Sequence, residues 1–383
     1  MGIALVLLLL VCNLTVATGT LSGIVFYANI VGVNRTFLLP VETTNTLSVF
    51  IAWLNLDFGV ETCFYNGMDA YGKTWLQFVF PVYIWLIVGL LVLVSRFSDK
   101  FARLLGNNPV SVLATLILLS YVKILCTIIA AMYFTYLEYP MKNQGVWVTD
   151  ANINYLSGKH IPLFLVATLF FLLLFLPYTL LLLSGQWLQA ISHLRLLAWV
   201  NRLKPFIDSY HAPYKARHRY WPGLLLVLRF GLLLIFAFNP QQNPSINLLA
   251  IGVGTSMLII WAWISGGVYR IWCLNALENS FALNLIILVV ATYPVQLSGG
   301  NQLAVGYTSV AIALVTFIGV LAYHTFQQMR AIKLLKKIPK LNQEFNETHA
   351  VNKPVSTPEV VEDFGQFREP LLENPPKLNY GAF

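Results

Sequence analysis

Eight stretches of mostly apolar residues dominate this sequence of 383 residues and constrain its fold more than any other feature. A helix needs about 20 apolar residues to cross the hydrocarbon core of a bilayer. Charged residues make up 10% of the chain, whereas an average soluble domain contains about 25%. We therefore predict an all-α fold, a polytopic bundle of transmembrane helices with additional interfacial helices. The predicted spans lie near residues 3–31, 75–94, 110–134, 161–183, 221–238, 246–268, 277–294 and 303–323.

The basic residues predict which loops face the cytoplasm. Segment 184–220 contains six Lys or Arg residues and one acidic residue, Asp208, and short loops rich in basic residues stay on the cytoplasmic side. When this segment is placed inside, the inside loops hold 15 Lys or Arg residues and the outside loops hold four. Both termini are then cytoplasmic. The predicted partners are the lipid bilayer and the anionic lipids of its inner leaflet, and we expect no nucleic-acid partner.

The two ends of the chain differ in character from the bundle, which is predicted to span residues 1–325. Residues 326–341 predict a basic amphipathic helix on the inner leaflet, and residues 342–383 a disordered cytoplasmic tail. At the other end, the apolar residues 4–11 and the small residues after them are also compatible with a cleaved signal peptide, which would leave seven spans. We favour an uncleaved first span, because apolar character resumes at residues 21–33.

Two of the predicted loops contain features of their own. The outside loop 32–74 includes the sequon that begins at Asn34, which predicts N-glycosylation. Its core, residues 47–56, is too apolar for a plain loop and predicts an interfacial helix. Within the cytoplasmic segment, residues 188–203 predict a second interfacial helix. Three prolines are expected to interrupt helical structure after residue 203: Pro205, Pro213 and Pro222.

Polar residues inside the predicted spans form the candidate functional site, because a charged side chain costs about 3 kcal/mol at the centre of a membrane helix. Lys123 is the deepest charge and is interpreted either as part of an ion or proton pathway or as a structural pair. Arg229 can extend toward the headgroups, so we favour a structural role for it. Glu278 and Asn284 are interpreted as helix–helix contacts. The candidate partners of Lys123 are Glu278, Ser120 and Tyr121.

Motifs of enzymes and metal sites are missing from the sequence. It contains no GxxxxGK[ST], no GxSxG, no HExxH and no paired Cys or His spacing of a metal site. The six histidines are scattered over both predicted sides and the tail. We therefore predict a protein that is not an enzyme, with no catalytic residues, no cofactor and no metal site.

Several runs of the sequence together resemble a known membrane module, which would cover residues 13–325. The runs are Trp53–Pro81, Asn108–Lys123, Tyr155–His160, Phe206–Arg229 and Leu277–Leu285. In these runs the chain resembles the C-terminal multi-span region of large invertebrate surface proteins with extracellular cysteine-rich or EGF-like repeats. More distantly, it is similar to the TRP-like membrane region of fungal flavin-carrier proteins. Those repeats are missing here, so the chain is either a shortened member or a fragment of a larger surface protein, and we favour the fragment because Cys63 lacks a partner cysteine on its side.

Three functions are compatible with these patterns. The resemblance implies a multi-pass TRP-like channel or transport module of unknown substrate, located in the plasma membrane. One alternative is a membrane anchor that displays extracellular repeats. The other is a seven-span receptor with a cleaved signal peptide, but the outside loop 135–160 lacks the cysteine that a receptor of this kind uses. The resemblance supplies no binding residues, so the ion or substrate is not predicted.

Overall fold

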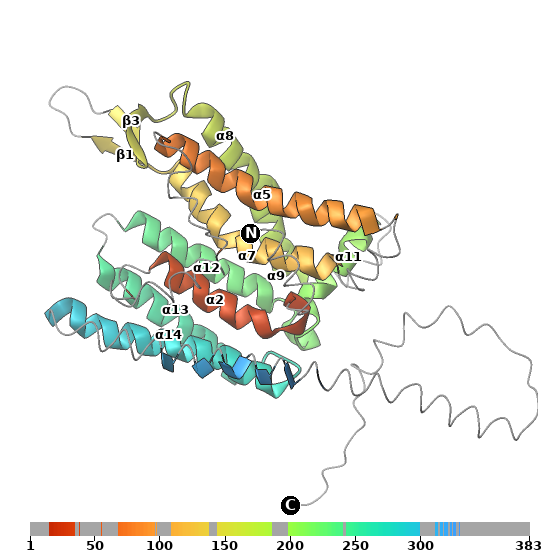
Figure 1. The fold of residues 1–383 in the computed structure, drawn as a ribbon. Coiled ribbons are helices and arrows are strands. Elements are labelled where there is room, and N and C mark those ends of the chain that lie inside the picture. Colours follow the sequence, from red (N-terminus) through yellow and green to blue (C-terminus); the bar gives the residue numbers. More distant parts are fainter. Residues whose placement is uncertain are drawn as a thin grey trace, which may run out of the picture. The chain divides into compact units, whose positions relative to one another are not determined.

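The computed structural model contains six helices that are long and apolar enough to cross a membrane among the residues that it describes (Figure 1). These helices agree with the predicted multi-pass membrane protein. They are Ala70–Leu91, Val110–Met132, Ile161–Leu183, Ala216–Phe238, Pro244–Ile264 and Trp272–Tyr293. The structure describes residues 15–34, 38, 55, 68–95, 97, 109–137, 144–185, 198–239 and 243–298, and scattered residues between 311 and 329.

The order of the elements follows the predicted series of spans. The elements are η1 (Val16–Thr18), α2 (Thr20–Val33), α5 (Ala70–Ser95), α7 (Pro109–Met132), β1 (Phe134–Leu137), β2 (Gln144–Trp147), β3 (Asp150–Asn154), α8 (Ile161–Leu169), η3 (Phe170–Phe175), α9 (Leu176–Leu183), α11 (Ala198–His211), η5 (Ala216–His218), α12 (Trp221–Phe238), α13 (Pro244–Ile264) and α14 (Trp272–Ser298).

The first and last predicted spans are not confirmed as predicted. The first was expected as one helix over residues 3–31, but α2 begins at Thr20 and is only 14 residues long. Before it, Gly19 has φ +74° and separates α2 from the short η1, a backbone conformation that glycine adopts without strain. The eighth span, 303–323, lies mostly outside the described residues.

Several other predictions fall wholly or partly outside the described residues. The interfacial helix at 47–56 and Cys63 are among them, apart from Asn55, which is buried. The basic helix at 326–341 and the tail at 342–383 also lie there, apart from Phe326 and Met329. The second interfacial helix, predicted at 188–203, overlaps only the first residues of α11.

The all-α prediction requires a correction in the outside loop 135–160. Strands β1, β2 and β3 form a three-stranded antiparallel sheet in the order β1-β2-β3. Trp147 on β2 is fully buried, and its indole Nε1 donates a hydrogen bond to the Ala130 carbonyl at 2.7 Å. The strands are only four or five residues long. Runs this short give no clear periodic pattern beside the long apolar runs of the spans, so the sequence analysis missed them. The sheet therefore covers the end of α7.

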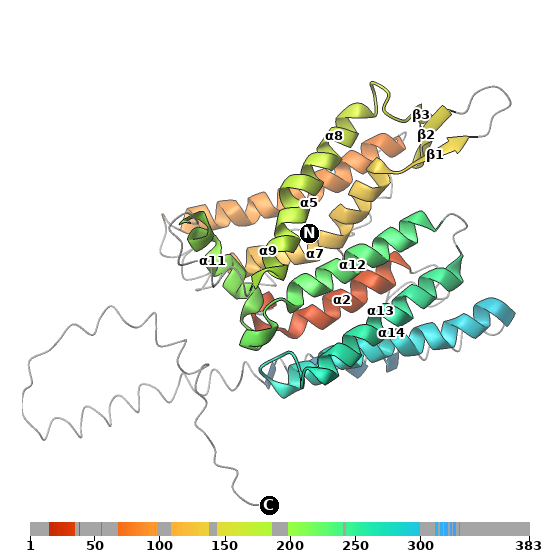
Figure 2. The same ribbon diagram turned by 180° about the vertical axis from the view of Figure 1, so that it is seen from behind.

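The helices pack in two groups that α12 joins. The first group contains α5, α7, α8 and α9, and the second contains α2, α13 and α14. Helix α12 contacts α7 and α9 on one side and α2 and α13 on the other. Both views of the ribbon show α12 and α2 lying alongside each other (Figure 2). The interface of α2, α7 and α12 thus lies in the interior of the bundle.

Prolines affect two helices differently from the prediction. Pro205 lies inside α11 and does not end it, and Pro222 lies in the first turn of α12, where a missing N–H costs nothing. In the fourth span, the π-helical turn η3 precedes Pro177. Pro177 has no N–H to offer the carbonyl of Leu173, and a local π adjustment is a common response to such a freed carbonyl.

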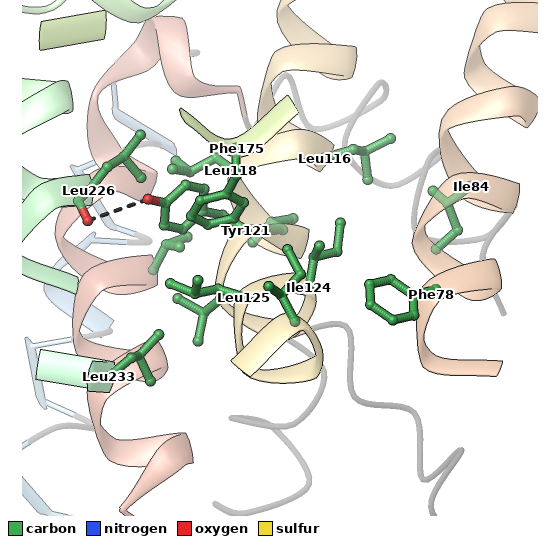
Figure 3. Close-up of a cluster of buried hydrophobic side chains, with 14 of the residues drawn as sticks. Phe78, Ile84, Leu116, Leu118, Tyr121, Ile124, Leu125, Phe175, Leu226 and Leu233 are labelled. Carbon is green, nitrogen blue, oxygen red and sulfur yellow. Dashed lines mark hydrogen bonds between the residues drawn. The ribbon is translucent and has the colours of Figure 1, made fainter. Parts of the chain in front are cut away.

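Helix α7 supplies more residues to the apolar core than any other element. Leu116, Ile124 and Leu125 on α7 are at most 1% exposed, and Figure 3 shows them between α5, which contributes Phe78 and Ile84, and the helices on the other side. Inside a membrane, such close packing stabilises helix association mainly through van der Waals contact. The core therefore fixes the position of α7 relative to its neighbours.

Two loops that were both predicted to be cytoplasmic meet at one end of the bundle. Tyr214 and Tyr269 form an antiparallel β-bridge, and the Lys215 amide donates a hydrogen bond to the Val268 carbonyl at 3.0 Å. At the opposite end of α7, the sheet lies in a predicted outside loop. This arrangement agrees with the alternation of loops that the basic residues predict.

Labelling of single cysteines tests this orientation. In a chain whose four native cysteines are replaced, we expect an Ala151→Cys variant to react with a membrane-impermeant maleimide on intact cells. An Ala216→Cys variant should react only after the membrane is permeabilised. Both alanines are exposed, so accessibility within the protein is matched. The reverse pattern would contradict the predicted orientation.

Candidate functional site

The centre of the candidate site is Arg229, in the middle of α12. The residue is 1% exposed, so its side chain does not extend to the headgroups as the sequence analysis favoured. No group in the described part of the chain accepts a hydrogen bond from Nε, Nη1 or Nη2. The guanidinium carbon lies 5.4 Å from the ring centre of Phe26 on α2, a cation–π contact. Arg229 is therefore a buried cation whose donors are unmet by the described part of the protein.

A small cavity lies beside Arg229 at the interface of α2, α7 and α12. Its volume is about 20 Å³, which is enough for one water molecule. The lining is apolar except for Arg229 and the side chains of Ser22, Tyr210 and Tyr214. A buried cavity that contains polar groups with unmet hydrogen bonds is the kind of site that holds a water or a small ion.

A row of hydroxyl groups leads from this cavity to Glu278 on α14. The Ser22 Oγ lies 3.2 Å from the Tyr214 hydroxyl oxygen, which lies 3.3 Å from the Tyr269 hydroxyl oxygen. The Tyr269 hydroxyl donates to Glu278 Oε2. The other carboxylate oxygen, Oε1, accepts a hydrogen bond from the indole Nε1 of Trp221 at 2.8 Å. Glu278 is thus held by two donors, and it also interacts electrostatically with Arg229.

The backbone at the end of the bundle positions the two tyrosines of this row. Gly266 and Gly267 have φ +65° and +82°, and they turn the chain after α13. The Lys215 Nζ donates to both of their carbonyls, at 2.7 and 2.8 Å. Asn275 Oδ1 accepts hydrogen bonds from the amides of Val268 and Tyr269 at 2.7 and 3.0 Å. The loop that carries Tyr269 is therefore fixed at several points.

Both loop tyrosines remain protonated at physiological pH. Burial is the main cause that raises the pKa of Tyr214 and of Tyr269 above the ordinary value, and the neighbouring charge of Glu278 raises each pKa further. A neutral phenol is both a donor and an acceptor of hydrogen bonds. Tyr214 and Tyr269 can therefore each receive one hydrogen bond while donating another.

A second set of tyrosines closes the other side of the cavity. The Tyr178 hydroxyl donates to the Tyr210 hydroxyl oxygen at 2.7 Å, and the Tyr210 hydroxyl donates to the Ala114 carbonyl on α7. Tyr121 stacks on Phe175 with ring centres 4.0 Å apart. Figure 3 shows its hydroxyl directed at the Leu226 carbonyl of α12, at 3.5 Å. These contacts connect α7, α9, α11 and α12 around Arg229.

A larger cavity opens at the end of the bundle that carries the sheet. Its volume is about 450 Å³, and its walls come from α2, α7, α12, the start of α13 and the turn between β2 and β3. Its lining includes Cys126, Leu233 and Asn247, and none of the described residues that line it is charged. The same three helices, α2, α7 and α12, line both cavities.

His211 lies buried at the end of the bundle that was predicted to be cytoplasmic, outside the candidate membrane spans. Burial and the neighbouring positive charge of Arg219 lower the pKa of His211 from 6.5 to about 4. Between pH 6.5 and about 4, His211 therefore binds a proton in the unfolded chain but not in the folded protein. We expect the folded state to lose up to about 3 kcal/mol of stability as the pH falls from 6.5 to 4.

A His211→Gln variant tests this expectation, because glutamine does not titrate in this range. Thermal unfolding in detergent should show a smaller loss of stability between neutral and acidic pH for the variant than for the wild type. Equal pH dependence in the two proteins would show that His211 does not have a depressed pKa.

The predicted site residues have different outcomes. Arg229 and Glu278 interact electrostatically in the structure. The hydrogen-bond partners of Glu278 are Tyr269 and Trp221, and not Lys123 as the sequence analysis considered. Lys123 is partly buried on α7, and its functional role stays a prediction. Its other candidate partners are bonded elsewhere: Ser120 to backbone carbonyls of α7 and Tyr121 to Thr179 and Leu226.

The two predicted asparagines are both buried. Asn284 is 1% exposed, and neither amide atom has a hydrogen-bond partner in the described part of the chain. Asn34 is 2% exposed, and its Nδ2 donates to the Ile30 carbonyl at 3.2 Å. Its Oδ1 accepts a hydrogen bond from Asn247 at 3.4 Å. Glycosylation of Asn34 stays a prediction, and it would require the amide to leave these contacts.

The tyrosines of the network were missed by the sequence analysis. Tyr210 and Tyr214 lie in the basic segment 184–220, whose charge was used only to predict the orientation. Tyr269 lies two residues after the pair Gly266-Gly267. Two tyrosines spaced four apart beside a membrane boundary, and a third after a glycine turn, were the available signals.

Comparisons with known proteins add no identification. No family model matches the chain, and no curated protein or solved structure matches it. The resemblance to TRP-like membrane regions therefore stays a prediction. Within the described ranges, no group of three or more His, Cys, Asp or Glu side chains is placed to hold a metal ion.

Proposed function

We propose that the protein is a membrane transport module whose pathway follows the interface of α2, α7 and α12. The observation that carries this proposal is Arg229, a cation in the middle of a membrane helix that is 1% exposed and has three donor nitrogens unmet within the described residues. Ionisable residues at this depth are costly and mark substrate or ion pathways.

The two cavities support a route along these helices. Leu233 and Cys126 line the larger cavity, and Leu225 and Leu118 line the smaller one, about two turns away on α12 and α7 respectively. Between the residues that line the two cavities, Val25 on α2 and Leu125 on α7 are both fully buried. The route is thus closed by apolar side chains in this structure, as expected of a gated or alternating-access pathway with a hydrophobic constriction.

The charge of Arg229 selects the kind of solute. A buried guanidinium attracts anions and repels cations, and the small cavity admits only a water-sized group. We therefore propose small anions as the transported class. The TRP-like resemblance, which implies a channel or transport module, points in the same direction without naming a substrate.

Flux from liposomes tests the proposal. The purified full chain is reconstituted into liposomes loaded with sodium chloride or sodium gluconate, and release of each ion is followed with ion-selective electrodes. We expect chloride release above that of protein-free liposomes, and no excess release of sodium or of the bulky gluconate. Release of none of the three ions would contradict transport and would favour the alternative in which the module only anchors extracellular repeats.

A further inference from the structure

We propose that Glu278 is a protonation site and that the hydroxyl groups of Ser22, Tyr214 and Tyr269 conduct protons between it and the cavity beside Arg229. This inference rests on the proposed transport function, which it deepens by making anion binding proton-coupled. It is carried by an unbroken row of hydrogen-bonding groups from the cavity to a half-buried carboxylate.

The direction of every hydrogen bond in the row is fixed when Glu278 is ionised. A carboxylate only accepts hydrogen bonds, so Tyr269 donates its single hydroxyl proton to Oε2. The Tyr269 oxygen is then the acceptor for the Tyr214 hydroxyl at 3.3 Å. By the same reasoning, the Tyr214 oxygen accepts from Ser22 at 3.2 Å. The Ser22 oxygen is left as an acceptor beside the cavity.

Proton transfer along this row balances at every atom. A hydronium ion in the cavity gives a proton to Ser22 Oγ and becomes water. Ser22 passes its own hydroxyl proton to Tyr214, Tyr214 passes its proton to Tyr269, and Tyr269 passes its proton to Glu278 Oε2. Each hydroxyl oxygen keeps one proton, and the carboxylate becomes a carboxylic acid. The reverse sequence returns the proton to the cavity water.

Few charged groups among the described residues face Glu278, so its protonation changes the charge balance of the site. Of the helices that pack on α14, α2 contributes one titratable residue, Tyr27, and α13 contributes none. Helix α12 contributes Arg229, together with the indole N–H of Trp221. The nearby cations on the loops, Lys215 and Arg270, are bonded to backbone carbonyls.

Coupling to an anion follows from charge neutrality. When Glu278 is ionised, its negative charge balances the buried positive charge of Arg229. When Glu278 is protonated, Arg229 is left uncompensated, and a small anion in the cavity restores neutrality where a net charge is expensive. Proton binding and anion binding therefore favour each other with equal strength, since linkage is reciprocal.

The test measures proton uptake by the full chain in detergent on rapid mixing with sodium chloride, using a pH indicator in weak buffer. Sodium gluconate, whose anion is too large for the cavity, is the blank. We expect uptake of about one proton per protein in the wild type at a pH where Glu278 is ionised. Glu278→Gln, which mimics the protonated side chain, should bind chloride without uptake.

The relay itself is tested by rates. Tyr214→Phe and Tyr269→Phe each remove one hydroxyl from the row, so proton uptake should slow by about 100-fold. Tyr155→Phe is the matched control, because it removes a hydrogen-bonded hydroxyl at the end of the bundle that carries the sheet, away from the row. Unchanged rates in both row variants would overturn the relay, and uptake in Glu278→Gln equal to that of the wild type would overturn the protonation site.

The two proposals fail in different ways. Chloride-linked proton uptake in detergent without chloride flux in liposomes would retain the proton site and reject transport. Chloride flux without proton uptake would retain transport and reject the coupling. If Tyr214→Phe fails to fold, Tyr269→Phe alone gives the kinetic readout, because it separates Glu278 from the rest of the row.

Discussion

Replacing Arg229 by methionine is expected to leave the protein as stable as the wild type or more stable, while its chloride flux is lost. Methionine keeps the length and the apolar stem of the side chain, and replacing a buried ion by a well-packed apolar residue is often neutral or stabilising by about 1–4 kcal/mol. Glu278 retains its bonds from Trp221 and Tyr269 and can take up a proton once Arg229 is gone. Loss of the unmet donors should weaken chloride binding roughly 10- to 100-fold.

Thermal unfolding in detergent and flux in liposomes are measured together for this variant, and Arg229→Lys is the matched control that keeps the charge. Lysine should retain part of the flux. A strongly destabilised Arg229→Met protein whose flux per folded molecule is unchanged would identify Arg229 as half of a structural ion pair, in line with the structural role that the sequence analysis favoured.

Replacing Gly223 by alanine is expected to cause the largest loss of stability among simple substitutions in the bundle. A Cβ atom at this position would lie 2.3 Å from the Leu183 amide nitrogen and 2.5 Å from its Cα. The obstacle is backbone, so α9 and α12 would have to separate. Overpacking of this kind costs about 3 kcal/mol, and it would also displace the helix that carries Arg229.

Gly231→Ala on the same helix is the control. A Cβ there would meet no atom within 4 Å, and alanine favours a helix by up to about 1 kcal/mol over glycine. The two variants should therefore shift the unfolding temperature in opposite directions. Equal unfolding temperatures would show that α9 and α12 do not approach each other at Gly223.

Much of the helical fold could be predicted because the length of an apolar run in the sequence matches the length of the helix that crosses the membrane. The predicted spans 161–183 and 221–238 agree with the structure at both ends. The sixth span was predicted to run to residue 268 but α13 ends at Ile264, because the chain turns at Gly266 and Gly267 with positive φ. The seventh begins at Trp272 and not at 277, since Asn275 bonds the loop backbone and does not need to lie outside the helix.

The candidate site could be predicted only in part. Depth in the membrane is visible in a sequence, and it singled out Arg229 and Glu278 as polar residues inside the spans, but Arg229 was expected to extend toward the headgroups and is instead 1% exposed. The partners of a side chain are not visible in this way. Tyr214 and Ser22 meet across 192 positions of the chain, and Glu278 is held by a loop tyrosine and by Trp221, which lies at a predicted span boundary. A charged residue at mid-span therefore marks a site without naming the groups that complete it.

Chloride uptake into liposomes tests the central claim, transport around Arg229, most directly. The wild type and Arg229→Met are reconstituted separately, and the outside solution is made more acidic than the lumen while potassium and valinomycin hold the membrane potential at zero. We expect wild-type liposomes to accumulate chloride together with protons and Arg229→Met liposomes to accumulate neither. Equal chloride uptake by wild-type, Arg229→Met and protein-free liposomes would contradict transport around Arg229.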